Sequence, residues 1–171
     1  RSYNLKIQST QPNVKMVKFV YDEANDLIKC FKIYEVEEPK LKKDNSRYFS
    51  IDPGLNNIVS IYNNIGIRPL LYNGRPIKSI NQYYNKTNAK LRSELPTNEK
   101  SSRRLKQLSF KRNNKIDYEM HKISSHIINE AIKNNISKIF IGNNNGWKKG
   151  IKIGKRNNQN FVNIPHTKLF N

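Results

Sequence analysis

One carboxylate, Asp52, follows a short apolar run and is the strongest candidate for chemistry in this chain. It lies in the stretch FSIDPGLNNIVSIY, residues 49–62, directly before Pro53 and Gly54. Proline cannot donate a backbone hydrogen bond and glycine adopts conformations closed to other residues, so we expect the strand to stop there, leaving Asp52 at a sheet opening. Mg²⁺ or Mn²⁺ prefers such rigidly held carboxylates, and phosphodiester cleavage with two metal ions needs several of them. The alternative is an aspartate that only forms the turn before Pro-Gly.

Positive charge is the second feature that bears on function. The 171 residues carry a formal net charge of +19, and the sequence pI is near 10.1. Residues 131–171 contain eight Lys or Arg and no Asp or Glu. Self-repulsion on this scale suits a polyanionic partner, and nucleic acid is the commonest one. We therefore expect DNA or RNA as the partner rather than a small-molecule substrate.

Two segments concentrate this charge. The run RRLKQLSFKRNNK, residues 103–115, has six basic residues and no acid, and residues 142–160 form a basic loop rich in Gly and Asn. Such density favours contact with phosphates, which positions nucleic acid without reading its sequence. The alternatives are a solvated helix face and a loop without a ligand. The candidate nucleic-acid-binding residues are Arg75, Lys78, Arg103, Arg104, Lys106, Lys111, Arg112, Lys115, Lys148, Lys149, Lys155 and Arg156.

Other chemically distinctive residues are few. Tyr83, Tyr84 and Trp147 can stack on bases, although such side chains more often pack in a core. Cys30 is the only cysteine, which excludes an internal disulfide and a zinc site built on cysteines. The three histidines are too scattered for a zinc site. No apolar run approaches the roughly 18 residues of a membrane span, so we expect a cytoplasmic, nucleoid-associated protein that does not bind membranes.

The pattern of apolar residues predicts the elements that must position Asp52. Residues 14–21 and 27–36 are predicted to form a β-hairpin or the edge of a meander, followed by a charged linker. Residues 48–52, 57–63 and 66–72 are predicted to form an antiparallel meander with short Asn/Gly turns. Asp52 then ends the first strand of that meander.

After residue 73 the apolar period becomes helical. One helix starts near Pro76 and ends at Pro96. A second, capped by Ser101 or Ser102, carries an apolar stripe to Ala131 that is expected to be interrupted near Asn113 and Asn114. Residues 138–141 are predicted to form a short buried strand, and IPHTKLFN begins another helix. This order predicts an α/β fold with a mixed sheet and packed helices, in which Asp52 lies beside the strand at 138–141 if the two pair in parallel.

Several stretches resemble a known family. SIDPGLNN resembles the first motif of RuvC-like nucleases, which have a ribonuclease-H-like fold. NGRPIKSINQYYNKTNAKLRSEL (73–95) and GWKKGIKIGKRNNQNFVNIPHTKL (146–169) are similar to the TnpB family, the OrfB proteins of insertion sequences. That family includes transposon-encoded RNA-guided DNA nucleases, relatives of type V CRISPR effectors. The resemblance extends from about residue 46 to residue 171.

The resemblance implies a domain organisation and a site. Residues 46–171 would be the N-terminal part of a RuvC-like nuclease domain with a long helical insert, truncated at the C-terminus. Residues 1–45 would be the tail of a β-barrel, or wedge, domain of oligonucleotide-binding type. Asp52 would be the first catalytic aspartate and a ligand of Mg²⁺ or Mn²⁺, and the partners would be DNA and guide RNA.

The second carboxylate of the family usually follows the fourth strand. Here that position is Gly142, and no acid lies after Glu130. The chain would then hold one catalytic acid of three and is expected to be inactive alone, although the complete protein would be an endonuclease.

Other interpretations stay open. The chain can belong to a catalytically dead TnpB-like protein that binds DNA and RNA as a repressor does, or to a degenerate transposase remnant. The IDPG stretch also resembles the phosphate-binding turn of actin-like ATPases and sugar kinases, but a second glycine-rich turn with Asp is missing. A junction resolvase is a closer relative, but the helical insert at 76–135 argues against it.

Overall fold

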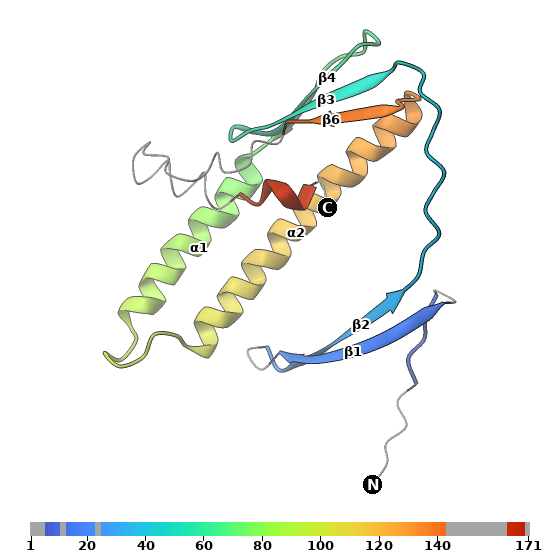
Figure 1. The fold of residues 1–171 in the computed structure, drawn as a ribbon. Coiled ribbons are helices and arrows are strands. Elements are labelled where there is room, and N and C mark those ends of the chain that lie inside the picture. Colours follow the sequence, from blue (N-terminus) through green and yellow to red (C-terminus); the bar gives the residue numbers. More distant parts are fainter. Residues whose placement is uncertain (1–5, 11–12, 23–24, 143–163, 170–171) are drawn as a thin grey trace. The chain divides into compact units, whose positions relative to one another are not determined.

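The computed structural model describes residues 6–10, 13–22, 25–142 and 164–169. The chain divides into two compact units, Arg1–Leu41 and Lys42–Asn171, and each is described by itself (Figure 1). The sequence placed a domain boundary between residues 45 and 46. The assignment of the first unit to a β-barrel domain stays a prediction.

The first unit is an antiparallel hairpin of β1 (Val14–Asp22) and β2 (Leu27–Tyr34), which confirms the predicted pairing. The Asp22 carboxylate accepts hydrogen bonds from Lys29 Nζ at 2.8 Å and Asn25 Nδ2 at 3.1 Å, and these bonds lower its pKa. No residue of either strand is buried. A hairpin of two strands is marginally stable at best by itself, so this unit contributes little core.

The second unit contains a mixed sheet of four strands. These are β3 (Tyr48–Pro53), β4 (Asn57–Asn63), β5 (Leu70–Asn73) and β6 (Lys138–Ile141), in the order β5-β4-β3-β6. β3 pairs antiparallel with β4 and parallel with β6, as expected from the sequence.

β5 starts at residue 70 rather than at the predicted residue 66. The Asn63 side chain explains the difference, because its Oδ1 accepts the backbone N–H groups of Ile65 and Ile67 and its Nδ2 donates to the Ile67 carbonyl. Gly66 has a φ of 77° within this turn, a conformation that glycine adopts without strain. The Asn63 side chain therefore holds residues 65–67 as a loop, and its hydrogen bonds take the place of those that a β-strand would form there.

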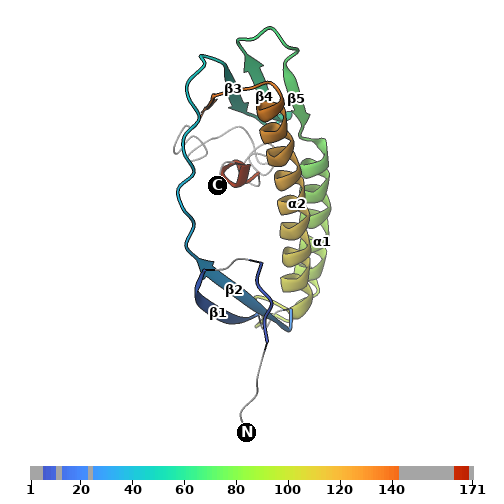
Figure 2. The same cartoon turned by 90° about the vertical axis from the view of Figure 1, so that its right-hand side faces the viewer.

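Two long helices, α1 (Arg75–Ser93) and α2 (Arg103–Lys133), form an antiparallel hairpin (Figures 1 and 2). Ser102 caps α2, since its Oγ accepts the Leu105 N–H at 3.3 Å. The predicted interruption near Asn113 and Asn114 is wrong, because α2 is continuous through both residues. Both asparagines are exposed, and the buried stripe on either side keeps the helix intact despite their weak helix propensity.

The core lies between one face of the sheet and α2. Phe49 and Ile51 alternate inward along β3 and pack with the α2 residues Ile116, Met120 and Ile127. The intervening residues of β3 are exposed on the other face. β6 was predicted to be buried, which is wrong: it is an edge strand whose residues are exposed except for the partly buried Ile139.

The C-terminal helix predicted from IPHTKLFN is only a short 3₁₀ turn, η1 (His166–Leu169), within the described residues. Ile164 and Leu169 nevertheless join the core. The main contribution of this segment to the second unit is therefore its two buried apolar side chains.

We expect Met120→Ala to lower the free energy of unfolding by about 2–5 kcal/mol, because Met120 is 1% exposed and its removal leaves a cavity. Ile132→Ala on the same helix is the matched control, since Ile132 is 69% exposed, and should change stability by at most about 0.5 kcal/mol. Urea unfolding followed by circular dichroism measures both. Equal losses for the two variants would contradict the assigned packing face of α2.

Candidate nucleic-acid interface

Asp52 lies near the end of β3, opposite Ser60 of β4 and on the exposed face of the sheet. β6 ends beside it, because Ile51 pairs with Ile141 and the Gly142 N–H donates to the Ile51 carbonyl at 2.9 Å. The parallel pairing confirms the expected neighbourhood of Asp52. It also places Gly142, the residue directly after β6, beside Asp52, because Ile51 and Ile141 are the last pair of the ladder.

Gly142 supplies no side chain at this position. A Cβ built there would lie 3.4 Å from the Ile51 carbonyl oxygen and 3.7 Å from Pro53 Cδ. These are ordinary contacts, so the backbone leaves space for a side chain. In the part of the chain that the structure describes, no three residues among His, Cys, Asp and Glu are grouped as a metal site. Asp52 alone does not fit a pair of metal ions, which needs several carboxylates.

The turn after Asp52 is held from two sides. The Gly54 N–H donates to the Ile58 carbonyl at 3.1 Å, and the Gly54 carbonyl accepts a hydrogen bond from Nε2 of the buried His166 at 2.8 Å. Sequence reasoning considered His166 only as a zinc ligand and rejected it. A histidine 112 residues from its partner carries no sequence signal for this role.

The start of α1 is tied to the same turn. The Gly74 N–H donates to the Asn56 carbonyl at 2.8 Å, and Lys78 Nζ donates to Asn56 Oδ1 at 2.7 Å. Of the two predicted residues on this helix, Lys78 therefore lies against the loop that follows Asp52. Arg75 is exposed, and its backbone N–H donates to Asn73 Oδ1 at 2.8 Å.

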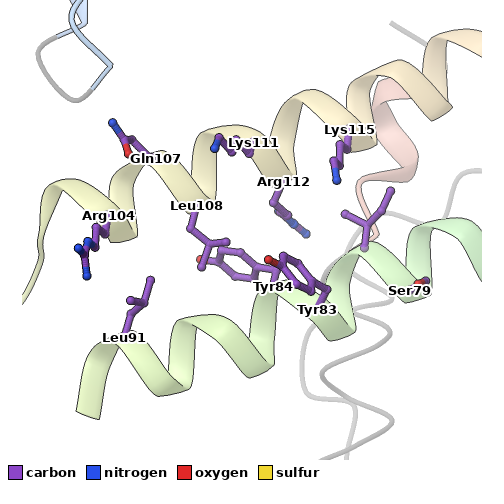
Figure 3. Close-up of a pocket in the computed structure, with 11 residues that line it drawn as sticks. Ser79, Tyr83, Tyr84, Leu91, Arg104, Gln107, Leu108, Lys111, Arg112 and Lys115 are labelled. Atoms are coloured by element: carbon purple, nitrogen blue, oxygen red, sulfur yellow. The ribbon is translucent and has the colours of Figure 1, made fainter. Parts of the chain in front are cut away.

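The basic residues of α2 do not share one face. Arg104, Lys111, Arg112 and Lys115 line a groove between α1 and α2 (Figure 3), because residues 104, 111 and 115 recur with the helical period. Lys106 instead lines a separate hollow together with Arg92, a residue that the sequence analysis did not single out. Arg103 lines neither. The predicted run is thus divided between surfaces.

The groove has a volume of about 640 Å³, and none of the described residues that line it is acidic. Its α1 wall contributes Tyr83 and Tyr84, whose rings lie between the two helices in Figure 3. The α2 wall contributes the four basic side chains and Leu108. Cationic and aromatic groups therefore converge in one hollow, which the order of residues in the sequence did not reveal.

Arg112 has a second set of contacts. Its Nε and Nη2 donate to Oδ1 of the buried Asn81 at 2.9 Å and 2.8 Å, and its guanidinium carbon lies 5.5 Å from the centre of the Tyr84 ring. Burial lowers the pKa of Arg112. Arg112 thus joins the two helices, and its contact with phosphate stays a prediction. Asn81 was missed, because a polar residue on a helix gives no sign of burial.

The remaining predicted residues, Lys148, Lys149, Lys155 and Arg156, lie outside the described residues, as does Trp147. No helix in the described segments is both long and apolar enough to cross a membrane.

The family model OrfB_IS605, described as a probable transposase, matches residues 32–148. The chain belongs to this family. The matched region of this OrfB_IS605 member includes Asp52, both long helices and all residues that line the groove. No curated protein matches the chain. The family assignment rests on the match to the family model.

We expect Arg112→Lys to lower the free energy of unfolding by about 1–3 kcal/mol, because lysine keeps the charge but cannot provide the two guanidinium donors to buried Asn81. Arg104→Lys is the control, since Arg104 is exposed, and should change stability little. Chemical denaturation of the two variants and the wild type measures the difference. If Arg112→Lys unfolds as the wild type does, Arg112 does not brace the helices.

Proposed function

We propose that this member of a transposase family binds DNA and guide RNA as part of a TnpB-like, transposon-encoded, RNA-guided system. The carrying observation is the set of exposed basic residues on α2. Among the described residues, Arg104, Lys111 and Lys115 form no ion pair, and no acid lines their groove. Cations that no internal acid neutralises are available to phosphates.

We also infer a ribonuclease-H-like, RuvC-like fold for the second unit. The sheet order β5-β4-β3-β6, with β6 parallel to β3 and the two helices inserted between β5 and β6, supports it. In such a domain Asp52 would be the first of several acids that hold Mg²⁺ or Mn²⁺ for phosphodiester hydrolysis in a complete protein.

A catalytically dead binding protein is the second candidate, and Gly142 favours it. Gly142 lies beside Asp52, where the TnpB resemblance places the second carboxylate, and the sequence contains no acid after Glu130. One carboxylate does not assemble a metal pair. Contact with phosphates needs exposed cations, which α2 supplies, whereas cleavage requires further acids.

We expect the 171-residue chain to leave supercoiled and linear DNA uncut with either Mg²⁺ or Mn²⁺, because among the described residues Asp52 belongs to no group of acids that could hold a pair of metal ions. Gel analysis of plasmid nicking measures this, and Asp52→Ala is the control for a contaminating nuclease. Metal-dependent nicking that disappears in Asp52→Ala would overturn the expectation and would establish Asp52 as a catalytic residue.

For binding, we expect replacement of Arg103, Arg104, Lys106 and Lys111 by Ala to flatten the slope of log K against log salt. Each phosphate contact contributes about −0.9 to this slope on duplex DNA, so the loss should be roughly 2–4 units. Titrations on one duplex at several salt concentrations give the slope.

The control removes the same charge from lysines that already pair with acids: Lys15, Lys29, Lys122 and Lys133. Exposed ion pairs contribute little stability, so this variant should fold and should change the slope much less. Identical slopes in the two variants would mean that net charge alone attracts nucleic acid, and the basic run at residues 103–115 of α2 would lose its assigned role.

A further inference from the structure

The groove between α1 and α2 has the composition of a nucleotide site. We propose that it holds one unpaired nucleotide of a nucleic-acid strand, with the base against Tyr83 and the neighbouring phosphates on Lys111, Lys115 and Arg104. This inference rests on the proposed nucleic-acid binding. It adds a preference for unpaired bases, which phosphate contacts on an open helix face alone would not give.

The size and shape of the groove suit such an occupant. Its volume of about 640 Å³ falls within the range of about 300–1,000 Å³ that is typical of sites for small ligands. Its lining includes the apolar side chains Ile80, Leu91 and Leu108 beside the polar Ser79 and Gln107. The three apolar side chains can accept the flat face of a base, and the polar side chains beside them leave donors for its edge.

The two tyrosines have different roles. Tyr84 is fixed, since its hydroxyl lies 3.2 Å from Ser109 Oγ and Arg112 lies over its ring. Tyr83 is 66% exposed although it lines the groove, so its ring is available for stacking. Stacking on aromatic side chains is a common way to hold single strands and tolerates different bases.

The cations are placed to hold the strand on both sides of that base. Arg104, Lys111 and Lys115 lie along one line of α2 and span about 16 Å of its axis at 1.5 Å per residue. All three are exposed. Arg112 needs no phosphate in this arrangement, because Asn81 already engages its guanidinium.

The occupant is an unpaired nucleotide rather than a base pair. In a duplex both faces of each base are covered by its neighbours, so an aromatic side chain reaches a base face only where the base is unstacked or flipped out. The groove lies between two neighbouring helices and holds about 640 Å³, which is room for one base but not for the width of a duplex. Single-stranded segments, bulges and ends are therefore the preferred targets.

The test compares Tyr83→Leu with Tyr118→Leu. Tyr118 is 68% exposed on α2 and does not line the groove, which makes it a matched control. The probes are a fluorescent single-stranded RNA, the same sequence as DNA, each strand with abasic sites, and a blunt duplex. Fluorescence anisotropy gives the affinity of the full chain for each probe, and circular dichroism confirms that each variant is folded.

We expect Tyr83→Leu to weaken binding of at least one intact single strand by about 5- to 100-fold, and to leave the abasic strands and the duplex unchanged. Tyr83→Phe should bind each probe as the wild type does, since phenylalanine keeps the aromatic ring. Tyr118→Leu should have no such effect.

The possible failures are distinguishable. An unchanged affinity of Tyr83→Leu for both intact strands, or equal losses on intact and abasic strands, would overturn the nucleotide site while the proposed phosphate binding stands. A wild-type chain that binds none of the probes would overturn both proposals.

Discussion

The second unit depends on one close approach between two backbone segments, the loop after β3 and the start of α1. A Cβ at Gly74 would lie 2.5 Å from the Leu55 carbonyl oxygen of that loop. The loop is also tight within itself, because a Cβ at Gly54 would lie 2.7 Å from the Asn57 carbonyl oxygen. Real Cβ atoms do not approach backbone oxygens this closely, so both positions require glycine for space rather than for an unusual φ. The Gly74 hydrogen bond to Asn56 follows from this approach. The start of α1 is thereby held against the loop that follows β3.

The polar contact between the helices fixes α2 in turn. Asn81 is 1% exposed, and its side-chain oxygen Oδ1 accepts two hydrogen bonds from Arg112. A shift of one helix along the other would leave a buried amide without these donors, which is costly. The pair therefore selects one register of the helical hairpin, and that register brings Tyr83 and Lys111 to the same groove. The loop contact at Gly74 and the hydrogen bonds between the buried Asn81 and Arg112 therefore both contribute to the groove.

Short sequence patterns predicted much of this fold, because strands, turns and helix caps depend on interactions between residues that are close in the sequence. The strand at residues 48–52 and a cap at Ser101 or Ser102 were predicted, and the structure has β3 there and the cap at Ser102. The loop at Asn63 was missed because side-chain hydrogen bonds replaced a strand that the apolar pattern favoured. The division of the basic run between two hollows depends on α1, and the partnership of Asn81 with Arg112 joins residues 31 positions apart. Neither feature can be predicted from the sequence of α2 alone.

The exposed strand β6 has a consequence for how copies of the molecule behave toward one another. Among the described residues its outer side pairs with no strand, and Phe140 is 54% exposed on it. Such an edge invites addition of a strand from another copy, and the charge of +19 opposes that encounter by repulsion. Salt shortens the range of this repulsion to about 8–10 Å near physiological strength. The ions that detach the chain from phosphates therefore also bring its copies closer together, so its colloidal stability and its hold on nucleic acid fall together as salt rises.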